Sequence, residues 1–416
     1  MRLATILRGL AGIVAAALVL LVLALVVDRV VLDRLADPDA RTPTPSVGEG
    51  RRDLFVLPDD GAAVLLDEFA SAERTIDIAV YLLTSDDVVG TLQAAVERGV
   101  EVRVLLEPDP YGGFGDVEAD AAHLRSLGVD VPFSGKDVRF GHIKTFVVDD
   151  RLALITSLNL TNAALTDNRE FGVISTEPDV VKTALDLFEA DWSGSALPEP
   201  GPLVIIPLNS RDTITDLIAF AESTIDVYAE VIRDEAVVAE LMERSSDGIV
   251  VRVVVPDEMS PDDTGIYIRM AGAGIEVRSI RSPYQHAKMI LVDGARALIG
   301  SINFTQTSMD DNREAGIVLD DELSVGRLAA VFELDWSNGE TALATAAERF
   351  DAGPGAFSRT DAQRRSTSGS RIVTVLPRPS SLTMPIVPPW ASTIILAIGK
   401  PSPDPPFFRS RRVPAW

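Results

Sequence analysis

The sequence predicts an α/β protein in which one transmembrane helix precedes two homologous layered units and a tail follows them. Three observations lead to this prediction. An apolar stretch without charges lies near the first residue, the segment after it is internally duplicated, and short β-branched runs alternate with helical patterns in each copy. Strands that alternate with helices are typical of α/β layers.

The apolar stretch runs from Gly9 to Val27 and is about as long as a helix that crosses the hydrocarbon core of a bilayer. Arg2 and Arg8 precede it, whereas charges of both signs follow it, which favours an inside N-terminus and an outside body. We therefore expect residues 1–35 to be a membrane anchor, with the rest of the chain on the extracytoplasmic side. A cleaved signal, which would make the protein secreted, is the alternative.

A linker at residues 36–52, rich in proline, glycine and charge, separates the anchor from the duplicated part. The duplication shows in paired segments that recur in the same order: "AERTIDIAVYLLTS" with "AESTIDVYAEVIRD", "VEVRVLLEPD" with "IVVRVVVPDE", and "FEADW" with "FELDW". We assign the first unit to residues 53–196 and the second to residues 197–340.

Each copy contains strand and helix signals. The runs "TIDIAVYLL" and "VEVRVLLE" are short and rich in β-branched residues, so we expect buried strands. The segment "SDDVVGTLQAAVERG" between them has an acidic start and a terminal glycine, which are typical of helix caps. The tail, residues 341–416, is rich in proline, has excess basic residues and lacks periodicity, so we expect disorder there.

Composition excludes several kinds of site and partner. The chain has no cysteine, which excludes disulfides, thiolate metal sites and cysteine nucleophiles. Its formal net charge of −24 repels polyanions, so tight nonspecific binding to nucleic acid is disfavoured. A local basic pocket can still bind a single phosphate.

Two of the three histidines stand at equivalent places in the copies, each two residues before a lysine at the head of an apolar run. The segments are "GHIKTFVVDD" and "QHAKMILVDG", and the pairs are His142 with Lys144 and His286 with Lys288. Alternate residues of a strand share a face, so each histidine and lysine are neighbours. Asp149 and Asp293 face the other way by the same parity, and we interpret them as structural supports.

A hairpin is expected after each of these segments, because Asp293-Gly294 is a strong turn dipeptide and a strand-like run follows it. We place the second turn between Gly294 and Ala295 and the first between Asp150 and Arg151. This register sets serine opposite lysine and asparagine opposite histidine in both units. The residues concerned are Ser157 and Asn159 in the first unit and Ser301 and Asn303 in the second.

A cluster of histidine, lysine, serine and asparagine suits a phosphoryl group. Lysine supplies a cationic donor to the non-bridging oxygens, serine and asparagine supply neutral donors, and histidine acts as nucleophile or proton carrier. The cluster is a poor metal site, because an ammonium group two residues from the histidine repels a dication. We expect neither a metal nor another cofactor.

The repeated pattern H-x-K-x4-D-x6-G-S-x-N resembles the phospholipase D superfamily over roughly residues 52–340. The second copy matches at every position, whereas the first has Thr156 in place of the glycine. The matched residues of the second copy are His286, Lys288, Asp293, Gly300, Ser301 and Asn303. The resemblance implies two α/β/α sandwich units packed about a pseudo-two-fold axis, with both motifs in one active site.

The resemblance also implies a two-step reaction without metal. One histidine attacks phosphorus to form a phosphohistidine, while the other protonates the leaving alcohol and then activates water or another alcohol. By analogy His142 is the nucleophile and His286 the acid and base, an assignment that the sequence alone leaves open. Glu170 and Glu314, each in a "DNRE" segment, resemble the residues that orient the histidines in some members. Capping or surface carboxylates are the alternative interpretation.

The anchor, the export and the acidity favour a phospholipid substrate. We expect a phospholipase D-type phosphodiesterase that hydrolyses a phospholipid to phosphatidate and a headgroup alcohol. A cardiolipin synthase-like phosphatidyltransferase is the alternative, although members of that class commonly carry two N-terminal spans. A secreted nuclease of the same superfamily and a non-enzymatic binding module are further alternatives. The acidic loops "EPDPYGGFGDVEAD" and "PDEMSPDDTG" argue against the nuclease, and the two complete motifs against the module.

Overall fold

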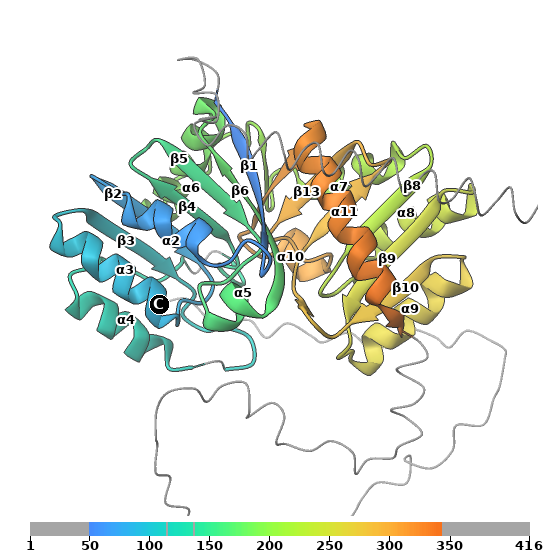
Figure 1. The fold of residues 1–416 in the computed structure, drawn as a ribbon, viewed down its shortest axis with the longest axis horizontal. Helices are drawn as coiled ribbons and strands as arrows, with labels where there is room; N and C mark the ends of the chain where they lie inside the picture. Colours follow the sequence, from blue (N-terminus) through green and yellow to red (C-terminus); the bar gives the residue numbers. More distant parts are fainter. Residues whose placement is uncertain (1–49, 114, 136–137, 343–416) are drawn as a thin grey trace, which may run out of the picture. The chain divides into compact units, whose positions relative to one another are not determined.

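A computed structural model describes residues 50–113, 115–135 and 138–342 of the chain. These residues form two mixed sheets with helices packed against them (Figure 1). No helix within these ranges combines the length and hydropathy needed to span a bilayer. The expected anchor lies outside the described residues, as do nearly all of the expected linker and tail.

The first sheet has seven strands in the order β1-β6-β5-β4-β2-β3, with β11 from the second unit added beside β6. Only β2 with β3 and β11 with β6 are parallel among these pairs. The strands of the first unit are β1 (Arg52–Leu57), β2 (Thr75–Val80), β3 (Glu101–Leu106), β4 (Lys144–Val148), β5 (Leu152–Thr156) and β6 (Asn168–Ser175). Its helices are α2 (Ala63–Ala70), α3 (Asp86–Glu97), α4 (Val117–Ser126), α5 (Asn162–Thr166) and α6 (Pro178–Ser193).

The second sheet has eight strands in the order β15-β10-β9-β8-β12-β13-β14-β7. Its strands are β7 (Leu203–Ile205), β8 (Thr224–Tyr228), β9 (Val250–Pro256), β10 (Glu276–Ile280), β12 (Met289–Val292), β13 (Arg296–Gly300), β14 (Ala315–Leu319) and β15 (Glu340–Thr341); β11 is Tyr284–Gln285. Its helices are α7 (Ser210–Ala219), α8 (Glu235–Ser246), α9 (Pro261–Gly272), α10 (Gln306–Asp310) and α11 (Glu322–Asn338).

The two sheets repeat one topology. Strands β1-β6-β5-β4-β2-β3 correspond in order to β7-β14-β13-β12-β8-β9. The expected strand and helix signals are found where the sequence placed them: β2 and β3 flank α3, which begins with Asp86 and Asp87 and ends before Gly99, a residue with φ of 91°. The duplication seen in the sequence is therefore a duplication of fold.

Three apolar cores hold the layers together. One core packs α2, α3 and α4 on the first sheet, and a second packs α7, α8 and α9 on the other. The third core takes residues from both sheets and from α6 and α11, with Phe171, Phe188, Tyr228 and Phe332 among its largest members. The contacts across this central core are reciprocal, β6 with β13 and β14 with β5. Helices thus lie on both faces of each sheet, and the two units meet through a shared interior.

The expected hairpin register is wrong by one residue in both units. Val148 pairs with Leu152 and Val292 with Arg296, so three residues form each turn and the centres fall on Asp150 and Gly294. Both centres have positive φ, 52° and 60°. Continued along the ladder, this register sets Thr156 rather than Ser157 opposite Lys144. A shift of one residue exchanges the faces of a strand, so the serines do not stand opposite the lysines.

Candidate active site

Each histidine reaches the site on a segment that pairs with the other unit. β11, directly before His286, runs parallel to β6, with Tyr284 opposite Asn168 and Gln285 opposite Arg169. In the same way Gly141, directly before His142, forms a bridge with Arg313. Both "DNRE" segments therefore lie beside the histidine segment of the opposite unit.

The consequence is an exchanged pair of histidine–glutamate contacts. His142 Nδ1 is 3.0 Å from Glu314 Oε2, and His286 Nδ1 is 2.6 Å from Glu170 Oε1. Both glutamates are fully buried, and the two histidine side chains are 12% and 11% exposed. A carboxylate at Nδ1 accepts the ring proton there and leaves Nε2 as the nitrogen available for chemistry. The sequence resemblance named these glutamates, and the structure shows that each serves the other unit's histidine.

The two lysines lie beside the histidines with unequal partners. Each ammonium group donates to the carbonyl of its own histidine, Lys144 at 2.9 Å and Lys288 at 2.5 Å. Lys288 also donates to Glu230 Oε2 at 2.8 Å. Lys144 instead lies over the ring of Tyr81, 5.3 Å from its centroid. Sequence reasoning missed both Tyr81 and Glu230, although the duplication aligns them.

Charges of both units act on the same groups, which places the two motifs in one site. Burial, and then the charges of Lys144 and Lys288, lower the pKa of His142, against the opposing effect of Glu314. Burial and the charge of Lys288 lower the pKa of Lys144 to about 7. Burial alone would raise the pKa of Glu314, but His142, Lys144 and a hydrogen bond from Asn312 hold it below its ordinary value. The lysine of one unit thus titrates under the influence of the other.

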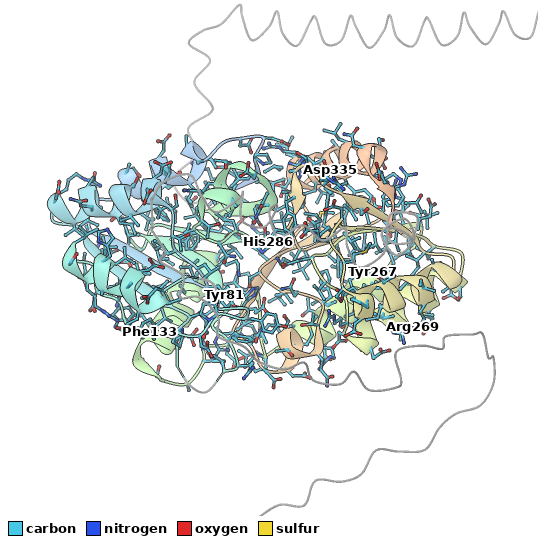
Figure 2. All side chains as sticks on the ribbon, turned by 90° about the horizontal axis from the view of Figure 1, so that it is seen from below. Tyr81, Phe133, Tyr267, Arg269, His286 and Asp335 are labelled. Carbon is cyan, nitrogen blue, oxygen red and sulfur yellow. The ribbon has the colours of Figure 1, made fainter. Side chains whose placement is uncertain are left out.

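Figure 2 shows the place of this cluster in the molecule. His286 of the second unit and Tyr81 of the first are both labelled near the middle of this view. The ring of Tyr81 meets the His142 ring edge to face, with centroids 4.6 Å apart. The cluster therefore lies where the sheets meet.

The expected substrate-binding serines are already engaged by the protein. Ser157 and Ser301 are fully buried. The hydroxyl of Ser157 donates to Glu170 Oε2 at 2.6 Å, and the hydroxyl of Ser301 accepts from the Ala315 amide at 3.1 Å. These contacts favour a role in supporting the glutamate strands over a direct contact with substrate.

Asn159 and Asn303 keep free hydrogen-bonding capacity. Both side chains are partly exposed, and in both the Oδ1 atom is buried without a hydrogen-bond partner among the described residues. Buried polar atoms without partners are uncommon in folded proteins and mark places where a ligand can bind. The asparagines remain our expected substrate contacts.

The departure of the first motif from the family pattern has a local explanation. The Thr156 hydroxyl donates to the carbonyl of Lys144 at 3.1 Å, and the side chain is fully buried. A Cβ at Gly300, the equivalent position, would lie 2.4 Å from the Ala315 carbonyl oxygen and 2.5 Å from Gly316 Cα. The second unit therefore requires glycine, whereas the first has room for threonine.

Asp149 and Asp293 lie at the hairpin turns, beyond the ends of their strands. Asp149 accepts from the backbone amides of Glu73, Arg74 and Thr75 at 2.7–3.2 Å, and Asp293 accepts from those of residues 222–224 at 2.7–2.9 Å. Burial opposes ionisation, but these hydrogen bonds lower the pKa of both carboxyl groups. Their contacts fit the structural role that strand parity suggested.

A second exchanged pair of contacts joins the units. Arg169 donates to both carboxylate oxygens of Asp335, at 2.7 and 3.0 Å, and Arg313 donates to Asp191 at 3.0 and 3.1 Å. The arginines come from the "DNRE" segments and the aspartates from "FEADW" and "FELDW". Both motifs were visible as repeats, but their pairing across the units was not. The same two segments thus fix the histidines and bind the units together.

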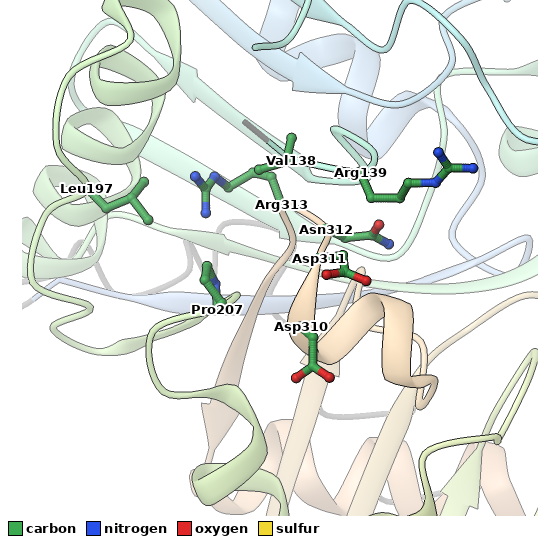
Figure 3. A pocket seen from close by; sticks show the side chains of 8 residues that line it. All are labelled: Val138, Arg139, Leu197, Pro207, Asp310, Asp311, Asn312 and Arg313. Carbon is green, nitrogen blue, oxygen red and sulfur yellow. The ribbon is translucent and has the colours of Figure 1, made fainter. Parts of the chain in front are cut away.

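A cavity of about 660 Å³ is lined in part by Asn312 and Arg313 (Figure 3). Its wall takes residues from both units, and Figure 3 shows Arg139 and Asn312 on adjacent parts of it. Asn312 donates to Glu314 Oε1 at 2.8 Å, so the cavity adjoins the support of His142. Its lining residues are Val138, Arg139, Leu197, Pro207, Asp310, Asp311, Asn312 and Arg313.

The described residues offer no group of three or more histidine, aspartate or glutamate side chains arranged to hold a metal ion. The ammonium groups inside the cluster would repel a dication. The arrangement can bind a phosphodiester, supply one nucleophilic nitrogen and supply one proton carrier.

Comparison with known proteins matches this geometry. A family model described as cardiolipin synthase, PLD-like domain, matches residues 65–192 and 214–336, one match in each unit and together more than half of the chain. A probable cardiolipin synthase of Bacillus subtilis (strain 168), YwiE, is 24% identical over 314 residues, which cover 65% of this chain and 62% of that protein. A mitochondrial cardiolipin hydrolase of Chlamydomonas reinhardtii is 31% identical over 127 residues, which cover 30% and 55%. The match therefore spans less than two thirds of the length of these relatives.

Two solved structures share the fold. The polyphosphate kinase of Porphyromonas gingivalis has a TM-score of 0.54 at 17% identity, over 69% of this chain and 50% of the kinase. The phosphatidylserine synthase of Haemophilus influenzae Rd KW20 has a TM-score of 0.51 at 12% identity, over 68% of this chain and 85% of the synthase. With both units matched by the family model and one cluster between them, the chain belongs to the phospholipase D superfamily.

Proposed function

We propose that the protein is a phosphatidyltransferase that moves a phosphatidyl group from one phospholipid to the hydroxyl of another, in the manner of a cardiolipin synthase. The sequence alone favours hydrolysis, with transfer as the alternative. The relatives similar across both units are named as cardiolipin synthases, which supports transfer more than hydrolysis.

One observation carries the proposal: the two histidines are held by glutamates of opposite units, with a lysine beside each. Such an arrangement needs both units for one reaction. Lys144, Lys288 and the two asparagines would bind the non-bridging oxygens of the phosphodiester. The histidine Nε2 atoms would then lie on either side of the phosphorus.

The reaction follows from these positions. Nε2 of His142 attacks phosphorus, a P–N bond forms, and the bond to the leaving alcohol breaks as Nε2 of His286 gives it a proton. His286 then takes the proton of the acceptor hydroxyl, whose oxygen attacks phosphorus and releases His142. Atoms and protons balance over the two steps, and no metal takes part.

Low solvent access favours an alcohol over water as acceptor. Each histidine side chain is about nine-tenths buried in the site between the two units. An enclosed site limits hydrolysis of a reactive intermediate. Access to lipid would come from the anchor that the sequence places at residues 1–35.

Hydrolysis remains the second candidate, because one unit is also similar to proteins named cardiolipin hydrolase. The test is to incubate the full chain with phosphatidylglycerol vesicles and a chelator and to quantify the lipids. The proposal predicts cardiolipin and glycerol in equal amounts. Phosphatidate with glycerol would instead assign a hydrolase. Unchanged lipid, or a reaction that stops with the chelator, would contradict both proposals. His142→Ala and His286→Ala should each abolish turnover.

A further inference from the structure

The duplicated units differ at one position that touches the reacting groups. Tyr81 follows β2 and Glu230 follows β8, at equivalent places in the repeated segments. Both side chains turn towards the histidine and lysine of their own unit. Both halves of the site therefore have a histidine, a lysine and a supporting glutamate, but they differ at the position of Tyr81 and Glu230.

On the first side the residue is an uncharged ring. Tyr81 packs against the His142 ring, and its hydroxyl accepts a hydrogen bond from the Tyr111 amide at 2.6 Å. Burial raises the pKa of Tyr81 to about 12, so the phenol stays neutral. Among the described residues, Glu314 is the only carboxylate in hydrogen-bonding contact with His142, and this contact is made to Nδ1 rather than to Nε2.

On the second side the residue is a carboxylate. Glu230 Oε2 is 2.8 Å from Lys288 Nζ and 3.5 Å from His286 Nε2. Burial acts to raise its pKa, but Lys288 and His286 hold the pKa well below its ordinary value. His286 therefore has a carboxylate near each ring nitrogen, Glu170 at Nδ1 and Glu230 at Nε2.

Two carboxylates favour the doubly protonated ring, whereas one favours a neutral ring with a lone pair on Nε2. The groups that face His286 are Glu170 from β6, Glu230 after β8, and Lys288, which lies in the same segment between β11 and β12. The Lys288 ammonium group is paired with Glu230. His286 thus lies between two carboxylates, whereas His142 contacts one, at Nδ1.

We propose that Glu230 is a positioning residue that keeps His286 protonated in the free site, which makes His286 the first proton donor and leaves His142 as the nucleophile. The proposal rests on the phosphohistidine reaction described above. When a phosphodiester binds, its oxygens replace Glu230 on Lys288, and the Nε2 proton passes to the leaving oxygen as the P–N bond forms at His142. The two motifs do not by themselves distinguish His142 from His286. Glu230, which lies outside both motifs, supplies the difference.

A histidine titration tests this directly, because the chain has only three histidines. The full chain with isotope-labelled histidine is followed by NMR across pH, as wild type and as Glu230→Gln. We expect the substitution to lower the midpoint of His286 by at least about one pH unit, a tenfold loss of proton affinity, and to change His142 less. An unchanged His286 midpoint, or an equal change in both rings, would overturn the proposal.

Leaving-group dependence gives a second readout that a purely structural role would not move. p-Nitrophenolate leaves without a proton, whereas an alkoxide needs one. Glu230→Gln should slow an alkyl phosphodiester at least about tenfold more than a p-nitrophenyl one, within the usual range for lost acid catalysis. Equal losses on both substrates would refute the assignment. Because the titration needs no turnover, it also separates failure here from failure of the transferase proposal.

Glu235→Gln is the matched control. This residue lies five positions further along the chain, is 73% exposed, and pairs with Arg269. The substitution removes the same charge from the same unit without touching the histidines. It should leave both titration midpoints and the ratio of the two rates unchanged, and a shift of either would overturn the assignment to Glu230.

Discussion

His142 of the first unit is hydrogen-bonded to Glu314 of the second, Nδ1 to Oε2, at 3.0 Å. The reciprocal pair joins His286 to Glu170 at 2.6 Å. The exchange arises because each histidine segment pairs with the opposite "DNRE" strand. Neither unit contains a histidine together with the glutamate that orients it, so a single unit holds only half of the site.

Glu314→Gln and Glu170→Gln should each lower kcat with little change in KM. The amide keeps the shape of the carboxylate but no longer favours the proton on Nδ1. Nε2 is then no longer held as the nitrogen that attacks phosphorus or transfers the proton. Loss of acid–base assistance lowers rates by about 10²–10⁴-fold. Steady-state kinetics on phospholipid vesicles measure this effect. Glu333→Gln, a distant substitution of the same charge, serves as control, and a change confined to KM would argue against the orienting role.

Asp149→Ala and Asp293→Ala should lower stability without slowing the folded enzyme. Each carboxylate accepts three backbone amides, which would be left without that partner at a cost of about 1–3 kcal/mol. Urea unfolding measures the loss, and turnover per folded molecule should stay near that of the wild type. A large fall in kcat at unchanged stability would instead assign these residues a catalytic role.

The pH dependence of that stability has a definite sign. Both carboxyl groups have a lowered pKa in the folded state, so their contribution is fully present above the pKa of an unfolded aspartate. It is lost as pH falls through the lower, folded pKa. The free energy of unfolding of the wild type should therefore decline more steeply in acid than that of either variant.

The motif residues could be found from the sequence because the duplication repeats them in one register. Asp149 lies apart from His142 and Lys144, but it belongs to the hairpin turn after β4 rather than to the opposite face of a strand. The hairpin register failed, since residues of positive φ at Asp150 and Gly294 lengthen each turn by one residue beyond what the dipeptide suggests. That error put Ser157 and Ser301 opposite the lysines, whereas their hydroxyls contact the glutamate strands.

The exchanged contacts lay beyond sequence reasoning for a physical reason. The repeats "DNRE" and "FExDW" showed that an arginine and an aspartate recur in both units. Which arginine pairs with which aspartate depends on how the two sheets pack, and periodicity within one unit carries no information on that packing. Tyr81 and Glu230 were aligned by the duplication. Their difference could have been noticed, but its meaning required the position of His286.

Arg169→Met should destabilise the protein more than Arg313→Met. Arg169 and its partner Asp335 are 2% and 4% exposed, whereas Arg313 and Asp191 are 11% and 15% exposed. Removing one partner of a buried ion pair leaves an uncompensated charge and costs about 3–5 kcal/mol, and the cost falls with exposure. Thermal unfolding of the two variants measures the difference. Equal losses of stability would contradict the stronger contribution that we assign to the buried Arg169–Asp335 pair.

Lys144 should give kcat/KM an alkaline limb near its pKa of about 7. The free enzyme loses a cation for the phosphodiester as pH rises through that value, so kcat/KM should fall up to about tenfold for each pH unit above it. Arginine stays charged, so Lys144→Arg should move the limb upward even if its maximal rate is lower. A limb that stays in place in the arginine variant would assign it to another group.

The lowered pKa of Lys144 also affects stability: the free energy of unfolding should rise with pH where kcat/KM falls. The pKa of Lys144 is lower in the folded state than the usual value for an unfolded lysine, so the unfolded chain binds more protons between about pH 7 and pH 10. The contribution of this group to the free energy of unfolding therefore rises with pH across that window, and Lys144→Met should remove it.

The most direct test of one shared site is to trap the covalent intermediate. His286→Ala is mixed with a p-nitrophenyl phosphodiester, which needs no proton donor to leave, and the protein is digested at alkaline pH and read by mass spectrometry. We predict an acid-labile phosphoryl adduct on the peptide that contains His142, and none when the same experiment is done with His142→Ala. An adduct in the His142→Ala protein, or steady turnover in both variants, would contradict it.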